Sequence, residues 1–249
     1  MVFFGSLISL LFFAFPVAGA EKISIVTESL PPYQIQGNQK EVSGMATEIV
    51  RAVLKEAGMQ GDIRMYPWAR AYKIALYQKN VLIYSIMRTR QRENFFKWVG
   101  VITPFDIYLH KLKSRTDVTV NSLEDCKKYL IGVVKDNAED HYFMSKRGFR
   151  TELSGNDILN IEKLLSKRVD LIPFNENMLS YRMKTKGHDV SEVEKLIHLP
   201  ETSADIYMAF NKNTPDSLVE KFRNAFDKIK KSGKYDSIRN KYLQTGGIQ

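Results

Sequence analysis

The sequence predicts an α/β protein in which parallel or mixed sheets are covered by helices. Segments rich in β-branched residues alternate along the chain with helical segments of roughly 10 to 15 residues. The 249 residues are enough for one large or two small domains, and no low-complexity linker or internal repeat interrupts the pattern. In open sheets of this kind ligands bind beyond the carboxyl ends of the strands. The residues that follow predicted strands are therefore the candidate site.

The part of the chain before residue 90 gives two clear strands and two clear helices. Segment 22–27 alternates apolar and polar residues and is rich in β-branched types, which indicates a strand. Apolar residues recur every four positions over 45–57 and Gly58 follows, which is typical of a helix ending at glycine. Similar patterns predict a helix over about 67–78 and a buried strand over 81–87.

The rest of the chain continues the alternation of strands and helices. A capping-box pattern at 122–125 predicts the start of a short helix. Strands are expected at 106–112, 129–134, 169–174 and 206–210, and helices at about 138–146, 157–167, 176–186, 216–232 and from about 235.

The N-terminus differs from everything that follows it. Residues 1–20 carry no charged side chain, and 7–17 is almost wholly apolar. The segment ends in Ala-Gly-Ala ahead of a charged pair, which is the pattern that signal peptidase cleaves, so we expect export to the periplasm. A retained N-terminal anchor and a buried first helix are the alternative interpretations. Lipid attachment at this point is excluded because no cysteine is nearby.

Composition excludes several kinds of site. Cys126 is the only cysteine, so an intramolecular disulfide and a thiolate metal cluster are both impossible. The four histidines show no metal-ligand spacing, and we expect neither a metal nor a cofactor. The net charge is +9, with nine Lys or Arg against four Asp or Glu over 211–242. Nucleic acid is one interpretation of that excess, but in an exported protein a solvated helical face near an anionic membrane is favoured.

Four segments that follow strands carry a family resemblance. They read TESLPPY (27–33), YPWAR (66–70), SIMRTRQRE (85–93) continuing to FKWVG (96–100), and VVKDNA (133–138). In this order, behind an export signal, they resemble the bacterial extracellular solute-binding proteins of the polar amino acid type, family 3. The resemblance runs from about residue 22 to 243, which is essentially the whole mature chain.

The resemblance implies a two-lobed fold of the type II periplasmic-binding-protein kind. Residues 1–20 would be the signal peptide, 21–105 and 205–249 the first lobe, and 106–204 the second. Two hinge strands would join the lobes, and closure would bury a small-molecule ligand between them. A membrane permease or a membrane sensor is the implied partner, and the chain is expected to act as a monomer.

The third segment holds the residue that the resemblance assigns to a ligand carboxylate, Arg92. A planar guanidinium binds both carboxylate oxygens at once, and in a closed cleft that pair is poorly screened. The alternative is a surface arginine in a basic run. Ser85 and Thr89 would place hydroxyls in the same cleft, and Arg88 would add a second cation or fill the pocket.

Aromatic rings and a helix start complete the implied cleft. Tyr33 and Trp68 are expected at the cleft lip, where rings pack against a ligand, although core packing would also explain them. Arg70 would point at the cleft or pair with an acid. Asp136, Asn137 and Ala138 begin a helix, whose free amides suit an anionic group or are simply N-capped.

One residue departs from the pattern of amino-acid binders. Asn175 stands where the resemblance implies an aspartate for the ligand's α-ammonium. A neutral amide cannot offset a desolvated ammonium. Glu28 or Glu176 would take that role, or the ligand lacks an α-amino group.

These residues favour a receptor over an enzyme. The expected function is capture of an amino acid or related carboxylate for an ABC permease or a sensor. The alternative is a dehydratase of the prephenate or arogenate type on the same fold, with Glu28 or Glu176 as the general acid. Neither a nucleophile–base pair nor a cofactor loop is visible in the sequence, so we expect no catalytic residues.

Overall fold

The computed structural model describes residues 22–37, 41–135 and 137–244. The predicted signal peptide and Asp136 lie outside these residues. The strands are β1 (Lys22–Thr27), β2 (Ile35–Gln36), β3 (Val42–Ser43), β4 (Gln60–Met65), β5 (Val81–Met87), β6 (Phe96–Phe105), β7 (Tyr108–Leu112), β8 (Leu130–Val134), β9 (Arg150–Ser154), β10 (Ile172–Phe174), β11 (Val193–His198) and β12 (Ala204–Asn211). The α-helices are α1 (Met45–Glu56), α2 (Trp68–Tyr77), α3 (Ala138–Ser145), α4 (Asp157–Leu165), α5 (Glu176–Thr185), α6 (Asp216–Lys231) and α7 (Lys234–Gln244). Short 3₁₀ turns are η2 (Glu93–Phe95), η3 (Glu124–Lys128), η4 (Val190–Glu192) and η5 (Pro200–Thr202).

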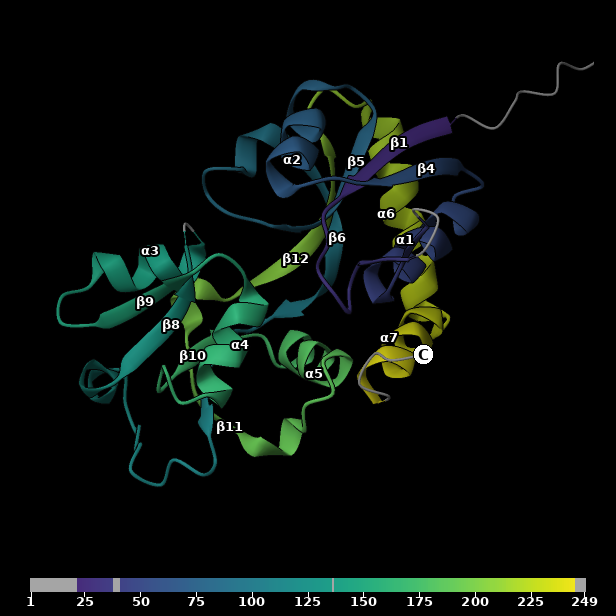
Figure 1. Ribbon diagram of the computed structural model, residues 1–249. Helices are drawn as coiled ribbons and strands as arrows, with labels where there is room; N and C mark the ends of the chain where they lie inside the picture. The colour runs from purple at the N-terminus through teal and green to yellow at the C-terminus, as the bar shows by residue number, and fades with distance from the viewer. Residues whose placement is uncertain (1–21, 38–40, 136, 245–249) are drawn as a thin grey trace, which may run out of the picture.

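A five-stranded mixed sheet in the order β4-β1-β5-β12-β6 forms one body of the molecule. Strand β1 pairs in parallel with β4 and β5, whereas β12 runs antiparallel to β5 and β6. Helix α2 packs on one face of this sheet, and α1 and α6 pack on the other, as Figure 1 shows. Because strand side chains alternate between faces, each strand contributes residues to the hydrophobic cores on both faces of the sheet.

The two faces of this sheet are filled by different residue types. On the α2 side, Ala71 and Ala75 pack against Val26 and Ile83, so small helix residues allow a close approach. On the opposite side, larger buried apolar residues of α1 and α6 cover the sheet. At Gly100 of β6, an added Cβ would lie 2.6 Å from the Phe226 ring, so only glycine admits that ring.

A second group of strands forms the other body. Strand β7 lies between β10 and β11 and is antiparallel to both, while β8 and β9 pair in parallel. A parallel bridge between Ile131 of β8 and Leu171, the residue before β10, connects the two-stranded sheet to the three-stranded one. Helix α4 packs on β7, β8, β9 and β10, and α3 packs on β8 and β9.

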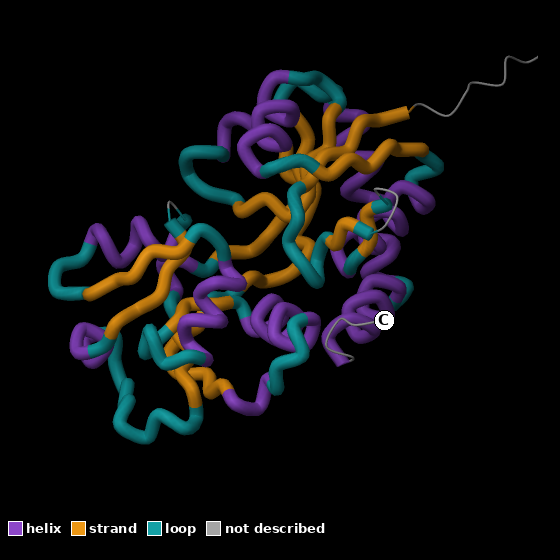
Figure 2. The backbone as a smooth tube through the Cα atoms, in the orientation of Figure 1, coloured by secondary structure: helices purple, strands orange, loops and turns teal. Residues whose placement is uncertain are grey.

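The chain crosses between the two bodies twice, and the two crossings lie side by side (Figure 2). Phe105 at the end of β6 pairs with Ala204 at the start of β12. The backbone N–H of Leu199 donates to the Ile107 carbonyl at 2.8 Å, and the N–H of Ile107 donates to Ser203 Oγ at 2.8 Å. These bonds hold the two connecting segments against each other.

The predicted α/β fold class with mixed sheets is confirmed, and most predicted elements are present within a few residues. Strands β2, β3, β4, β6, β9 and β11 are absent from the sequence prediction. The predicted capping box is wrong in detail, because the Asp125 carboxylate accepts from Asn121 N, Ser122 N and Ser122 Oγ, and the turn that follows is 3₁₀. Across the described ranges no helix combines the length and apolar character needed to cross a membrane.

Candidate functional site

Two adjoining cavities lie between the two bodies of the molecule. The first has a volume of about 430 Å³ and includes residues of α2, β5 and the start of α3. The second has a volume of about 250 Å³ and includes residues of β6, β10 and α5. Both are lined by Leu30, Met87, Phe105, Asn137 and Ala138, so they form one continuous cleft. We call them the arginine cavity and the inner cavity. Their size is that of small-molecule sites.

Arg92 lines the arginine cavity and gives it its name. Its Nη1 donates to the Met87 carbonyl at 3.0 Å. Its guanidinium carbon lies 5.0 Å from the Trp68 ring centroid and 5.2 Å from that of Tyr72. Burial lowers the pKa of the guanidinium from its ordinary value, whereas Tyr72 and Glu28 raise it. None of the salt bridges among the described residues involves Arg92, so its partly desolvated charge has no carboxylate in direct contact.

Glu28 lies in the same cavity, directly after β1. Burial raises the pKa of its carboxyl to about 7, and the positive charge of Arg92 opposes part of that rise. Glu28 and Arg92 are therefore close enough to interact, although no direct ion pair forms between them. At neutral pH Glu28 is poised to gain or lose a proton according to what binds next to it.

Ser85 and Trp68 complete the wall of the arginine cavity on the side of the five-stranded sheet. Ser85 is buried near the end of β5 with a φ of 59°, and its hydroxyl accepts a hydrogen bond from the Gln34 side chain. Trp68 begins α2 and its ring packs against that of Tyr72, tilted by 36° with ring centroids 5.4 Å apart. A left-handed backbone in a non-glycine residue is strained, and such strain is common at ligand sites.

The other arginines of this region point elsewhere. Arg88 makes a bidentate pair with Glu93, with Nε 2.8 Å from Oε2, and lies 5.3 Å from the Trp98 ring centroid. Arg70 is exposed and lies 4.5 Å from the Tyr66 ring centroid. Neither lines the cleft. Thr89 contributes its carbonyl to the turn, accepting from Arg92 N at 2.9 Å, and its side chain is not part of the cavity wall.

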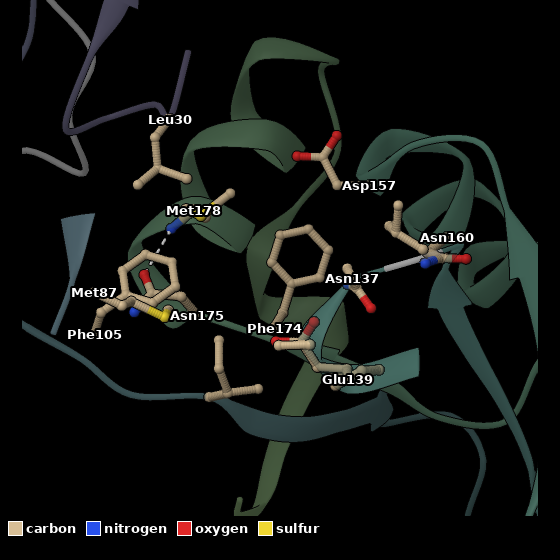
Figure 3. A pocket seen from close by; sticks show the side chains of 14 residues that line it. Leu30, Met87, Phe105, Asn137, Glu139, Asp157, Asn160, Phe174, Asn175 and Met178 are labelled. Atoms are coloured by element: carbon tan, nitrogen blue, oxygen red, sulfur yellow. Dashed lines mark hydrogen bonds between the residues drawn. The ribbon is translucent and has the colours of Figure 1, made fainter. Parts of the chain in front are cut away.

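The start of α3 supplies the facing wall. Asn137 caps the helix, because its Oδ1 accepts from the Asp140 N–H at 2.8 Å. Asn137 and Ala138 line both cavities, so the positive end of the helix faces the cleft as well as being capped. Glu139, the next residue, lines the inner cavity and points into it (Figure 3).

Asn175 lines the inner cavity, but its amide is already engaged. Its Oδ1 accepts from Tyr33 Oη at 3.1 Å and from the N–H groups of Asn177 and Met178 at the start of α5. Figure 3 shows the Met178 bond. Its Nδ2 donates to the Asp106 carbonyl at 3.1 Å. Asn175 thus ties a loop of the first body and a connecting segment to helix α5, and has no acceptor left for a ligand ammonium.

Tyr33 and Glu176 lie away from the cleft. Tyr33, expected at the cleft lip, is fully buried, and its hydroxyl also accepts from Asn177 Nδ2 at 3.1 Å. Glu176 is exposed and pairs with Lys195 at 2.9 Å. Of the sequence-predicted residues, the structure brings six together in the arginine cavity or its border with the inner one: Glu28, Trp68, Ser85, Arg92, Asn137 and Ala138.

Several lining residues are absent from the sequence prediction. Leu30, Met87, Phe105 and Phe174 give the cleft apolar walls, and Glu139 gives it a carboxylate. The signal for Glu139 is its place one residue beyond the predicted helix start, where the first turn of a helix still faces the strand ends. Within the described ranges no three His, Cys, Asp or Glu side chains gather to hold a metal ion.

The sequence profile of the bacterial extracellular solute-binding proteins, family 3, matches residues 23–245. No curated protein matches the chain.

Solved structures share the fold. The probable amino-acid ABC transporter extracellular-binding protein of Bacillus subtilis superposes with a TM-score of 0.76 at 16% identity, over 90% of this chain and 98% of its own. A histidine kinase sensor domain with similarity to periplasmic binding proteins gives 0.74 at 16%, over 90% and 96%. An ancestral arginine-binding protein bound to arginine gives 0.71 at 18%, over 89% and 98%. At these identities the likeness shows the fold alone: the two-lobed type II arrangement.

Proposed function

Because this chain belongs to the bacterial extracellular solute-binding proteins of family 3, we propose that it captures a small polar solute between its two lobes. The observation that carries the proposal is Arg92, a desolvated cation that lines an interlobe cavity and forms no ion pair with any described residue. A buried charge is costly unless it is paired, so such a site favours a ligand that supplies the missing anion.

The lobes of this proposal follow the two bodies of the fold. We propose 21–105 and 205–249 as the bounds of the first lobe and 106–204 as those of the second, with the paired connecting segments as the hinge. Rotation about those segments would bring the start of α3 toward Arg92. A ligand carboxylate between them would then meet both a guanidinium and the amides of a helix N-terminus.

We propose that Glu28, in place of Asn175, binds the ligand's α-ammonium. Glu28 lies in the arginine cavity, whereas the Asn175 amide is consumed by Tyr33, Asp106 and helix α5. Binding of an ammonium would stabilise the ionised form of Glu28, whose pKa is about 7 without a ligand. The proposed ligand is therefore an amino acid or a related carboxylate.

We further propose that residues 1–20 direct export and that the protein works in the periplasm. Its solved neighbours include both an ABC transporter binding protein and a sensor domain of a histidine kinase. Delivery to a permease and presentation to a membrane sensor are both compatible with a cleft that closes over its ligand, and co-purification with membrane proteins from the native host would distinguish them.

The test is a thermal-shift screen of the mature chain, residues 21–249, against L-amino acids and dicarboxylates, followed by calorimetry. A specific ligand should raise the melting temperature by mass action. Arg92→Ala should abolish that rise, while Arg70→Ala, which removes an exposed arginine outside the cleft, should preserve it. A ligand bound equally well by the Arg92→Ala protein would contradict the proposed site.

One observation supports an enzymatic alternative. A carboxyl with a pKa of about 7, as at Glu28, suits a general acid at neutral pH. A dehydratase of the prephenate or arogenate type would use such an acid. Incubation of the purified protein with prephenate decides between the two functions: the receptor leaves it unchanged beyond the spontaneous rate, and the enzyme consumes it.

A further inference from the structure

The ionisable side chains that line the inner cavity are all acidic. Its polar lining consists of Asn137, Glu139, Asp157, Asn160 and Asn175, and no Lys, Arg or His is among its described lining residues. An anionic group that entered this cavity would meet two carboxylates and no cation. Like charges at close range in a partly desolvated site repel each other, so this cavity favours a cation over a second ligand carboxylate.

The two carboxylates of this cavity differ in how they are compensated. Asp157 at the start of α4 pairs with Arg182 of α5, with Oδ2 2.8 Å from Nε. Glu139 forms no salt bridge with any described residue, and its carboxyl interacts with its own backbone and the Asn137 side chain. Burial raises the pKa of Glu139 above its ordinary value. Glu139 is therefore the carboxylate of the inner cavity that lacks a counter-charge.

The residues around Glu139 indicate which kind of ligand group would neutralise its charge. Phe174, Met178, Phe105 and Ile107 also line the inner cavity and make its walls largely apolar. Figure 3 shows the Phe174 ring and the Glu139 side chain within the same cavity. Aliphatic stems pack on such walls while their charged end reaches a polar group. A flat aromatic face also attracts a cation.

Asn160 adds a second polar group to this end of the cleft. It is 3% exposed, it lines the inner cavity, and its Oδ1 has no hydrogen-bond partner among the described residues. A buried amide oxygen without a partner costs free energy until a donor reaches it. Rotation of the amide about its terminal bond exchanges oxygen and nitrogen, so the group can turn an acceptor toward a ligand that carries several N–H donors.

We propose that the solute carries a second cationic group at the end of an aliphatic stem, bound by Glu139 in the inner cavity. The ligand class is then a basic amino acid: a carboxylate at Arg92, an α-ammonium at Glu28, and a side-chain ammonium or guanidinium at Glu139. This inference rests on the proposed function and narrows it. A cation bound beside each of the two carboxyls would keep Glu28 and Glu139 ionised. The resulting order of charges, negative at Glu28, positive at Arg92 and negative at Glu139, complements the charges of such a molecule.

The test compares ligands that share a shape and differ in charge. L-Arginine and L-citrulline are nearly isosteric, but the end of citrulline is a neutral urea. Calorimetry on the mature chain should show binding of L-arginine or L-lysine, and binding of L-citrulline at least about 30-fold weaker, because a neutral group leaves the Glu139 charge uncompensated.

The variant Glu139→Gln tests the cationic ligand group separately from the proposed receptor function. It should weaken L-arginine about 10- to 100-fold and change L-citrulline less than about 3-fold, since only the charge at position 139 is lost. The control Glu162→Gln alters an exposed glutamate of α4 outside the cleft and should leave both affinities unchanged.

Two results would overturn the inference. Tight binding of L-glutamate or L-glutamine with no binding of arginine, lysine or ornithine would refute the cationic ligand while leaving the receptor function in place. Equal loss of arginine and citrulline in Glu139→Gln, with an unchanged melting temperature, would show that Glu139 does not recognise charge. If no amino acid of the panel bound, both this inference and the proposed function as an amino-acid receptor would be refuted.

Discussion

Replacement of Arg92 is the sharpest test of the cleft. The guanidinium donates to the Met87 carbonyl at 3.0 Å and also interacts with the Tyr72 side chain, which leaves part of its fork of donors for a ligand carboxylate. Its flat face is held near the rings of Trp68 and Tyr72, so the fork is oriented before a ligand arrives. Arg92→Ala removes the charge and the fork together, whereas Arg92→Lys keeps the charge and loses the planar geometry.

The expected loss of ligand affinity follows from the hydrogen bonds that the substitution of Arg92 would remove. Charge-assisted hydrogen bonds contribute about 1.5 to 3 kcal/mol each, and a bidentate pair in a desolvated site lies toward the top of that range or above it. Arg92→Ala should therefore weaken the ligand about 10- to 1000-fold. The ligand affinity of Arg92→Lys should lie between those of the parent and of Arg92→Ala, because a point charge still attracts the carboxylate.

Isothermal titration calorimetry with the ligand found by screening gives these affinities directly. Arg88→Ala is the matched control, since Arg88 belongs to the same turn but pairs with Glu93 outside the cleft. Melting temperatures without ligand show whether each variant is folded. An Arg92→Ala protein that keeps its melting temperature and the parent affinity would refute the carboxylate assignment. So would an Arg88→Ala protein that loses as much affinity as Arg92→Ala.

Two further variants test how the cleft is built. Glu28 holds its proton up to a pH of about 7 in the folded chain and loses it near 4.5 in the unfolded chain, so its contribution to stability falls as pH rises between those values. Glu28→Gln should raise the free energy of unfolding by at most about 3 kcal/mol at pH 8 and by almost nothing at pH 4, measured by urea denaturation; a difference independent of pH would contradict the buried carboxyl. Asn175→Asp should lower the free energy of unfolding by about 1 to 3 kcal/mol, because it replaces the Nδ2 donor to Asp106 with an acceptor. The same variant should not tighten amino-acid binding, and a large gain in affinity would show that position 175 faces the ligand after all.

The elements predicted best from the sequence are those whose residues pack on one sharply defined core. The four-residue apolar spacing over 45–57 became α1, and the continuous apolar run over 81–87 became β5. Strand β6 was missed because Pro104 interrupts its pattern. In the structure β6 is an edge strand, and an edge tolerates a residue that cannot donate to a neighbour.

Strands β9 and β11 were missed for a different reason. Their sequences, RTELS and VEKLIH, are half-exposed, so hydrophobic alternation is weak and charge dominates the local pattern. Lys111 of β7, for example, lies 3.6 Å from Glu194 of β11. Pairing of this kind depends on neighbours far away in sequence, which local propensity does not register.

The site shows a similar division. The rule that ligands bind beyond strand ends located the segments that hold Glu28, Ser85 and Arg92, because the ends of the strands follow from topology. The choice of Arg92 as the carboxylate ligand came from the family resemblance. The rule about strand ends does not distinguish Arg92 from Arg88. The Arg88 side chain is held outside the cleft by its pairing with Glu93. The role of Asn175 was equally hidden, since its partners Tyr33 and Asp106 come from distant segments.

The row of aromatic rings beside the cleft has a practical consequence. The rings of Trp68, Tyr72, Phe96 and Trp98 follow one another at centroid spacings of 5.4 to 5.8 Å. The chain has only two tryptophans, and both belong to this row. One lies against Arg92 and the other against Arg88. Indole emission responds to a nearby charge and to solvent, so the protein carries its own optical reporter on one wall of the cleft. Occupancy can be followed without a label, and Trp98→Phe leaves a single emitter in contact with the arginine that the ligand is proposed to meet.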